Sequence, residues 1–415
     1  MAYDIFQLMD FIYDQNGSDI HLSVGRPPTI RVSGRMRSIK GVPLTPDDTL
    51  HLANQLLPPR MKLEFREKGG ADFSHAHGTK CRFRCAVYRQ KGSVGMVLRL
   101  LPSRILSFEQ IGLPLQVRDL LDRPRGLILV TGPTGCGKTT TLATMIDYIN
   151  TNFDHHIVTV EDPIEYYHEH KMSIMTQREI GTDVGTFAEA MRRVLRMDPD
   201  VILLGEMRDL ETISTAITAA ETGHLVLGTL HTTGSARTVD RIIDAYPSDQ
   251  QEQCRAQLSV ALLAVISQVI MPRADKPGLV AAFEVMIMTP AIENLIRKNE
   301  TFKIKSTLQT ARNLGMVMLD DYLWELYKAG KISKESLLQK SQEPKEVQRK
   351  LDFEALGAAG QPPGSAPPAA GAPPGPASPG GPAPGAAPPA GGSAGGAAGA
   401  PGSKPPSIFN RKKEG

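Results

Sequence analysis

The sequence is poor in cysteine, in net charge and in long apolar runs, and each shortage excludes a class of protein. Four cysteines in 415 residues cannot form the disulfide framework of a small secreted domain. A formal net charge of +3, without a Lys/Arg block in the part expected to fold, does not indicate nucleic-acid binding. The longest apolar stretch, Leu258 to Met271, is interrupted by Gln268 and is too short to span a bilayer. Residues 1–11 lack the basic start of a secretory signal, so we expect a soluble, cytosolic protein that reaches a membrane only through a partner.

The C-terminal part of the chain also lacks the residues that build a core. From about Gly357 to Pro406 the sequence is almost wholly Gly, Ala, Pro and Ser. Such a composition cannot bury enough apolar surface to offset chain entropy, so it predicts a disordered tail over 357–415. The closing residues 407–413 combine Ile408 and Phe409 with three cations. Two interpretations stay open for them, a short docking peptide and a solvated terminus, and the second is favoured.

Two histidines and two cysteines lie close together and have the chemistry of zinc ligands: His75, His77, Cys81 and Cys85. We predict two strands here, 71–77 and 80–88, joined by a two-residue turn. In that register His75 is opposite Arg82, and the histidines face the side of the hairpin opposite to the cysteines. This arrangement favours cysteines in an apolar core over a zinc site.

Length and composition predict two folded domains and a tail. We expect an α+β domain over 1–101, a linker over 102–124, an α/β domain over 125–356 and the tail over 357–415. In the first domain the sequence indicates two helices and several strands: a helix over 3–13, strands over 19–24, 29–33 and 93–101, and a helix that follows Thr45 and ends at Pro58.

In the second domain, short continuous apolar runs alternate with helical segments. The runs Ile157–Val160, Val201–Leu204 and Leu225–Leu230 are typical of strands covered on both faces, so we predict a parallel sheet with helices on both sides. The rest, to about Leu356, is expected to be mainly helical, with one strand at 284–287.

A phosphate-binding loop follows the first strand of this domain, the apolar run 126–131. In such a loop, backbone N–H groups at the start of a helix converge on an anion, and apolar residues at helical spacing follow Thr139 here. We expect Lys138 to reach the β- and γ-phosphates and the Thr139 hydroxyl to bind Mg²⁺. The loop predicted to bind ATP comprises Gly132, Pro133, Thr134, Gly135, Cys136, Gly137, Lys138, Thr139 and Thr140.

Ionisable residues end three of the predicted strands, where phosphate chemistry needs them. Glu161 and Glu165 follow the second strand, Glu206 follows the third, and His231 follows the fourth. We expect Glu206 to polarise the attacking water, although Gly205 stands where an Asp usually precedes such a glutamate. The alternative for Glu206 is an ion pair with Arg208. For the other residues it is an ordinary structural role.

Hydrolysis also needs positive charge for the transition state. The predicted hairpin carries Arg82 and Arg84 on one face, and Arg99 lies on the next strand. Arginine suits this task because its planar guanidinium grips phosphate oxygens in two places. On the residues alone, a solvated basic face is slightly favoured over this role.

Four motifs in order resemble the secretion-type ATPases of type IV pilus and type II secretion machines. They are the loop 132–140 and the stretches 159–166, 198–209 and 224–233. The segments 17–23 and 82–90 look like those of the pilus retraction branch. The resemblance covers about residues 1–350.

The resemblance implies a homohexamer of a PAS-like N-terminal domain and a RecA-like ATPase domain. It further implies docking on an inner-membrane platform protein at the cytoplasmic face. ATP would lie in the cleft between the two domains, and domain pairs would close one after another round the ring about a hinge at about 102–114. By motif, Glu206 looks like the catalytic glutamate, Glu161 and Glu165 the acidic box, and His224 and His231 the histidine box. Arg84 and Arg99 look like the arginine pair that completes the pocket, with Arg82 as the alternative.

Two positions depart from the family pattern. Cys136 stands where Ser is usual, and its side chain is expected to point away from the phosphates. Glu293, in the helix-like motif 291–297, replaces a customary Arg. This change keeps open a companion motor of the accessory retraction type. The alternatives are an assembly ATPase, whose usual Cys-x-x-Cys insertion is missing here, a nucleic-acid translocase, and a non-catalytic ring subunit.

Overall fold

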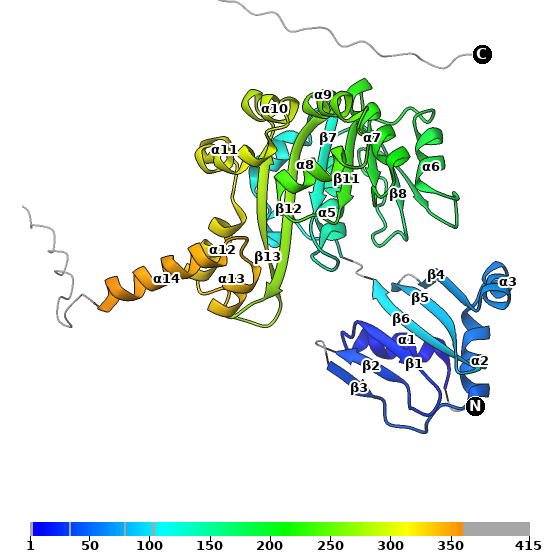
Figure 1. The fold of residues 1–415 in the computed structure, drawn as a ribbon. Coiled ribbons are helices and arrows are strands. Elements are labelled where there is room, and N and C mark those ends of the chain that lie inside the picture. The colour runs from blue at the N-terminus through cyan, green and yellow to red at the C-terminus, as the bar shows by residue number, and fades with distance from the viewer. Residues whose placement is uncertain (1–2, 33–34, 79, 102–103, 360–415) are drawn as a thin grey trace, which may run out of the picture. The chain divides into compact units, whose positions relative to one another are not determined.

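The computed structural model describes residues 3–32, 35–78, 80–101 and 104–359 (Figure 1). Residues 102–103 of the predicted linker, and the predicted tail from residue 360 with its closing segment 407–413, lie outside the described residues. The described residues up to Ala358 belong to one compact unit.

The described N-terminal residues form an antiparallel six-stranded sheet in the order β3-β2-β1-β6-β5-β4. Three helices bury their apolar sides against it, and the core holds Ile12, Leu52 and Phe83. Pro58 and Pro59 end one helix and also start the next, because proline is well suited to the first helical turn. The strands are β1 (Asp19–Leu22), β2 (Thr29–Val32), β3 (Arg35–Ser38), β4 (Gly70–His77), β5 (Cys81–Gln90) and β6 (Ser93–Leu101), and the helices are α1 (Ile5–Asp14), α2 (Pro46–Leu56) and α3 (Pro59–Lys68).

The predicted hairpin register was wrong by one residue. His77 pairs with Cys81 and His75 with Phe83, so the histidines share a face with the cysteines. Cys81 and Cys85 are buried in the N-terminal core, as expected. His77 instead contacts Asp10 of α1, with Nε2 3.1 Å from Oδ1. No group of side chains in the described part of the chain is arranged to hold a metal ion.

The second sheet has seven strands within the described residues, in the order β13-β12-β7-β11-β10-β8-β9. All neighbours run parallel except β12 and β13, which pair antiparallel over nearly their whole length. The strands are β7 (Gly126–Thr131), β8 (His156–Glu161), β9 (Ile174–Glu179), β10 (Val201–Leu204), β11 (Leu225–Leu230), β12 (Leu262–Pro272) and β13 (Leu279–Ile287).

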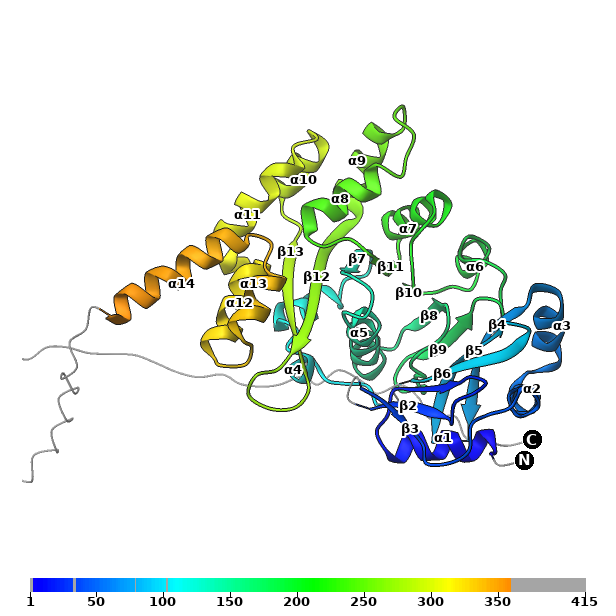
Figure 2. The ribbon, with the colours of Figure 1, turned by 60° about the horizontal axis from the view of Figure 1, so that its bottom comes forward.

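Helices cover both faces of this sheet (Figures 1 and 2). Along β7, Leu127 and Leu129 enter one core, and Ile128 and Val130 enter the other, which is the period of two expected for a strand buried on both sides. One face packs on α6 (Phe187–Val194), α7 (Leu210–Thr222), α8 (Ser235–Ile243), α9 (Gln251–Ala261), α10 (Pro290–Arg297) and α11 (Ile304–Thr310), and the other on α4 (Phe108–Ile111), the 3-10 turn η1 (Leu115–Leu120) and α5 (Lys138–Asn152).

The C-terminal helices form a third packed group against β12 and β13, with Val269, Leu323 and Leu337 in its core. They are α12 (Leu319–Lys328), α13 (Lys334–Lys340) and α14 (Pro344–Ala359), preceded by the short turns η2 (Thr301–Lys303) and η3 (Arg312–Leu314). Helix α14 continues past the predicted tail boundary at residue 357.

The predicted α/β fold class is confirmed, with two corrections to its elements. The region after β11 is mainly helical, as predicted, but the apolar run near residue 262 forms a strand, β12, that was not predicted, and β13 is longer than the strand predicted at 284–287. Part of the predicted linker is packed structure, since Val117 and Leu121 lie in the core beside β7. No helix in the described ranges has the length and apolar character to cross a membrane.

Candidate nucleotide-binding site

The loop between β7 and α5 has the geometry of an anion cradle. Gly132, Gly135 and Gly137 have positive φ angles of 142°, 77° and 89°, a region that other residues rarely adopt. A Cβ atom on Gly132 would lie 2.3 Å from the carbonyl oxygen of Gln268, so only glycine fits there. Gly137 is the N-cap of α5, and no side chain caps this helix start, so its first N–H groups are left for an anion.

Lys138, the first residue of α5, lies across this loop. Its Nζ donates to the carbonyl oxygens of Gly132, at 2.8 Å, and Pro133, at 3.3 Å. Burial lowers the pKa of Lys138, while the nearby Cys136 and Glu206 oppose that shift. The ammonium group is therefore held against the backbone of the loop.

Gln268 of β12 supports the loop from below and was missed by the sequence prediction. Its Nε2 donates to the carbonyl oxygen of Cys136 at 2.6 Å, and its Oε1 accepts from the Thr141 hydroxyl at 2.8 Å. The side chain is 1% exposed. The signal was present in the sequence as a long polar side chain inside an otherwise apolar strand, where a buried amide must find partners.

Cys136 is buried and turned away from the cradle. A Cβ on Gly132 would meet its Sγ at 2.7 Å, which places the thiol under the loop. Burial raises the pKa of this thiol. Cys136 thus contributes its backbone, and not a reactive thiolate, to the loop.

Glu161, at the end of β8, is 8% exposed. Burial raises its pKa to about 7, although hydrogen bonds from Thr159 and Gln177 act in the opposite direction. The Thr159 hydroxyl donates to its Oε1 at 2.7 Å. Glu165 is half-buried in the wall of the same cavity.

Glu206, after β10, lies between two cationic or protonatable groups. Its Oε1 accepts from Arg208 and lies 3.0 Å from Nε2 of His231. The predicted alternative, an ion pair with Arg208, is thus present in this structure. The glycine before it also has a steric reason, because a Cβ on Gly205 would come within 3.2 Å of the Glu161 backbone.

The two histidines of the predicted histidine box lie at opposite ends of β11. His231 follows the strand and its Nδ1 is 3.5 Å from the Thr134 hydroxyl, in the pocket. His224 precedes the strand, and its Nδ1 lies 3.0 Å from the carbonyl oxygen of Ala219 at the end of α7. A six-residue strand spans about 20 Å, so His224 is remote from the phosphate-binding loop.

The N-terminal sheet contributes Arg84 and Arg99 to the same pocket. These residues are direct partners across β5 and β6, and both are exposed. Arg82 has a different place: it donates to the carbonyl oxygen of Ile164 at 2.7 Å, and its guanidinium lies 3.8 Å from the ring centre of Tyr167. Arg82 is therefore a contact to the segment after β8 and not a wall of the pocket.

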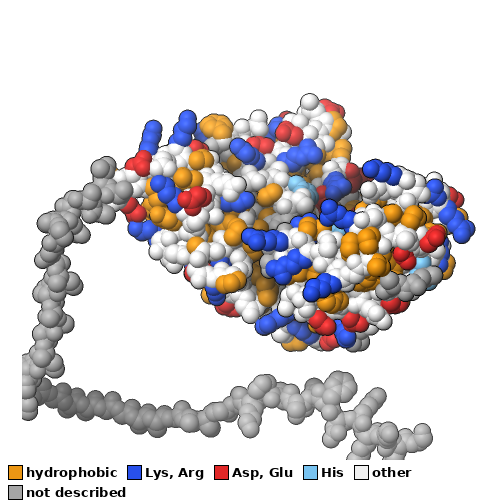
Figure 3. Space-filling view, turned by 90° about the horizontal axis from the view of Figure 1, so that it is seen from below, with side chains coloured by type: hydrophobic (Ala, Val, Ile, Leu, Met, Phe, Trp, Pro, Cys, Tyr) orange, Lys and Arg blue, Asp and Glu red, His pale blue; other side chains and the backbone are white. Residues whose placement is uncertain are grey.

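Together these residues enclose a cavity of about 560 Å³. It combines anion-binding backbone, a lysine, three arginines and four carboxylates, which fits a nucleoside triphosphate with a divalent cation. In Figure 3, Lys and Arg side chains gather near the centre of the face shown. The predicted site residues in its lining are Thr134, Gly135, Gly137, Lys138, Thr139, Thr140, Glu161, Glu165, Glu206, His231, Arg84 and Arg99.

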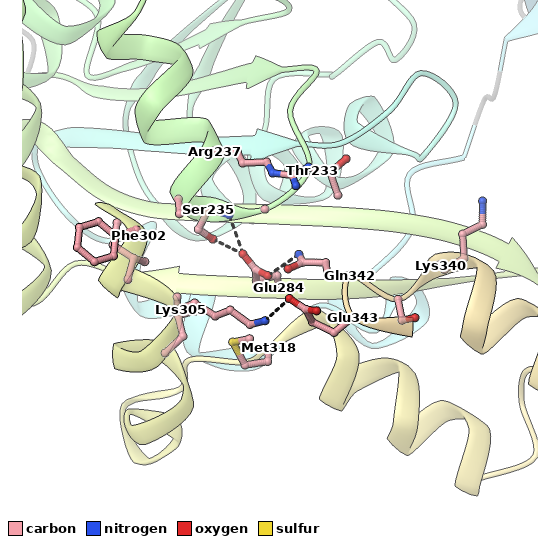
Figure 4. Close-up of a pocket in the computed structure, with 15 residues that line it drawn as sticks. Thr233, Ser235, Arg237, Glu284, Phe302, Lys305, Met318, Lys340, Gln342 and Glu343 are labelled. Carbon is pink, nitrogen blue, oxygen red and sulfur yellow. Dashed lines mark hydrogen bonds and ion pairs between the residues drawn. The ribbon is translucent and has the colours of Figure 1, made fainter. Parts of the chain in front are cut away.

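A second cavity, of about 450 Å³, lies between the start of α8 and the C-terminal helices (Figure 4). At its floor Glu284 of β13 is 3% exposed and accepts from the Ser235 amide, the Ser235 hydroxyl and Nε2 of Gln342, at 2.7, 2.8 and 2.8 Å. Lys305 and Glu343 form an ion pair at its rim, at 2.8 Å. These three hydrogen bonds of Glu284 join elements of the fold.

Comparison with known proteins gives consistent matches. The family described as "Type II/IV secretion system protein" matches residues 74–322. The chain is 46% identical over 341 residues to the type IV pilus retraction ATPase PilT of Pseudomonas aeruginosa, covering 82% of this chain and 99% of that relative. It is 37% identical to the type IV pilus ATPase PilU of the same organism, covering 80% of this chain and 87% of PilU. The crystal structure of the pilus retraction motor PilT with bound ADP aligns with a TM-score of 0.78 at 46% identity, covering 84% and 99% of the two chains.

Proposed function

The chain belongs to the type II/IV secretion system protein family, among its secretion and pilus ATPases, and we propose that it is the motor that hydrolyses ATP to power type IV pilus retraction. The observation that carries this proposal is the pocket, in which a phosphate-binding loop, strand-end carboxylates and two arginines of a separate sheet line one cavity. The similarity to a retraction ATPase, which covers 82% of this chain and 99% of that relative, supports the same choice.

The pocket residues divide the chemistry among them. Gly132 to Thr140 hold the phosphates through backbone N–H groups, and Lys138 adds a point charge to the β- and γ-phosphates. Glu206 polarises the attacking water, for which it must release Arg208, and His231 orients the glutamate from the neighbouring strand. Arg84 and Arg99 compensate the charge that develops on the transferred phosphoryl group.

The donor set also fits a magnesium ion. The Thr139 hydroxyl stands at the start of α5 beside the cradle, and Glu161 and Glu165 lie in the same cavity to accept from water. When bound, Mg²⁺ would neutralise charge on the phosphate oxygens. Because burial holds the Glu161 pKa near 7, this carboxyl group can also be present in protonated form at neutral pH.

We further propose that the chain works as a homohexamer on the cytoplasmic face of the inner membrane, against a platform protein of the pilus machine. Arg84 and Arg99 are exposed, and a ring that closes in sequence would bring them against the loop. The accessory role of a PilU-like motor is the second candidate. Glu293 favours this candidate, because the retraction branch customarily has Arg at that position. In this structure Glu293 pairs with Arg297 of the same helix, α10, at 3.7 Å.

Substitution of Glu206 tests the catalytic assignment. We expect Glu206→Gln to bind ATP as the natural chain does and to lose turnover, because the amide cannot polarise water. Equilibrium binding of a fluorescent ATP analogue and phosphate release measure the two steps. Unchanged hydrolysis would remove Glu206 from the mechanism.

Deletion of the gene tests the direction of the motor. Cells without a retraction motor are expected to carry many pili and to lose twitching, whereas cells without an assembly motor are bald. Normal pili with weakened twitching would indicate the accessory role. Complementation with Glu206→Gln should fail to restore twitching.

A further inference from the structure

A row of charged side chains crosses the N-terminal sheet on the side opposite to its core. Arg31, Asp19, Arg99 and Arg84 are paired in this order across β2, β1, β6 and β5. Directly opposite residues point to the same face, so three arginines share this face with one carboxylate. The neighbours Arg99 and Arg84 repel each other, and both line the nucleotide pocket.

Asp19 is the buried centre of this row. It is 5% exposed and accepts from Nε of Arg99 at 2.9 Å and from the Ser18 hydroxyl at 2.8 Å, with Nε of Arg31 at 3.4 Å. Burial alone would raise the pKa of Asp19, but the hydrogen bonds from Arg99 and Ser18 hold it below its usual range. The carboxylate is therefore charged at neutral pH.

The contact leaves the working end of Arg99 available. Asp19 takes up Nε, and the two Nη nitrogens at the tip of the fork remain for an anion. The Arg99 side chain is 65% exposed, so without an anchor it would sample many rotamers. Asp19 is the ion-pair partner of Arg99 found among the described side chains.

We propose that Asp19 is a positioning residue for hydrolysis: it fixes the Arg99 guanidinium at the pocket wall and offsets the repulsion between Arg99 and Arg84. This inference rests on the proposed role of the arginine pair. Asp19 does not lie in the pocket wall, so it acts only through Arg99. The apolar residues that hold β1 in the core, Ile20 and Leu22, point to the other side of the strand.

A double-substitution cycle tests this on the full-length protein. Steady-state ATP hydrolysis is measured for Asp19→Asn, Arg99→Ala and the two together. We expect Asp19→Asn to lower kcat about tenfold, as a loosened catalytic group does, with KM for ATP changed less than twofold. In the Arg99→Ala background the same substitution should have no further effect. Asp10→Asn is the matched control, because Asp10 also contacts two basic side chains, Lys80 and His77, but away from the pocket.

Each outcome decides between the interpretations. If Asp19→Asn lowers kcat equally with and without Arg99, the role of Asp19 is purely structural. If Asp19→Asn keeps the kcat of the natural chain, Asp19 has no role in hydrolysis. Either result overturns the inference. If Asp19→Asn does not fold, Asp19→Glu keeps the charge but displaces Arg99, and should give the same non-additive loss. Failure of the proposed function gives a different result. If this pocket does not hydrolyse ATP, Lys138→Ala will have the same ATP turnover as the natural chain, whatever residue stands at position 19.

Discussion

Two buried polar residues at the phosphate-binding loop and in the pocket wall respond differently to burial. Glu161 and Gln268 are both nearly inaccessible, yet Gln268 has a partner for each end of its amide and Glu161 keeps a carboxyl group that burial disfavours as an anion. Of these two residues, only Glu161 therefore makes the stability of the apo protein depend on pH.

We expect Glu161→Gln to stabilise the nucleotide-free protein at pH 8 and to have little effect at pH 5. The folded-state pKa of about 7 lies above the usual value of 4.5, so the folded protein binds the proton more tightly and stability falls as pH rises from about 4.5 to 7. The full effect is at most about 3 kcal/mol. Thermal melts from pH 5 to 8 without magnesium measure it.

The exposed Glu169, in the segment that follows Glu161, provides the control. Glu169→Gln should shift the melting temperature equally at all these pH values. A constant difference between Glu161→Gln and the natural chain across the range would show that Glu161 does not titrate in the folded protein.

Local sequence was sufficient for the residues whose role depends on neighbours in the chain. The phosphate-binding loop and the strand-end acids were predictable because glycine conformation and strand ends are read over a few residues. Gln268 was not, since its partner Cys136 is far away in sequence. Arg84 and Arg99 could be named, but their meeting with the loop depends on tertiary structure. Their roles, with those of the other site residues, stay predictions.

Among the elements, α8, β13 and the segment before α14 meet at one carboxylate (Figure 4). Glu284 accepts the first amide of α8 and the side chain of Gln342, whose own backbone N–H donates to Asp320 of α12. Glu284 thus takes the place of an N-cap side chain for α8, because the N-cap residue Gly234 has no side-chain oxygen.

We expect Glu284→Leu to destabilise the protein by about 3 kcal/mol or more, because three donors lose their acceptor in a buried place. Denaturant unfolding measures the loss, and proteolysis should become faster in α13 and α14. Glu346→Leu, on the exposed side of α14, is the matched control. Equal stability of the two variants would contradict a joining role for Glu284.

Elements were predicted well where the sequence pattern has one interpretation. The period of two in β6 defined that strand exactly, whereas the continuous apolar run of β12 fits a strand or a buried helix equally. The predicted β4–β5 register was wrong because it assumed a two-residue turn, whereas His77 pairs with Cys81 and leaves three residues between the strands.

At the scale of the whole described unit, the two sheets are joined around Glu179 of β9. Its carboxylate accepts from the Ser74 hydroxyl at 2.9 and 3.0 Å and from the Ile164 amide at 3.2 Å. Arg82 adds a more distant ion pair at 3.8 Å, and its side chain is 12% exposed. The N-terminal sheet thus contacts the segment that carries Glu165.

We expect Arg82→Met to lower the stability of the protein by roughly 3 kcal/mol, because Glu179 loses its buried cation and the Ile164 carbonyl loses its donor. Arg82→Lys should rescue little, since one ammonium group cannot serve both partners. Calorimetry measures both. Arg89→Met, an exposed change on the same strand, should cost much less, and equal losses would refute the assignment.

Two adjacent residues of β12 contact two loops that line the candidate nucleotide pocket. Gln268 donates to the loop before α5, and the Ser267 hydroxyl accepts from the Gly234 amide, three residues after His231. The spacing of these loops is therefore set by a single peptide unit within a strand that is hydrogen-bonded on both sides. The part of the pocket formed by these two loops is thus held in one geometry. We expect any movement that accompanies ATP binding to occur in the part that carries Arg84 and Arg99.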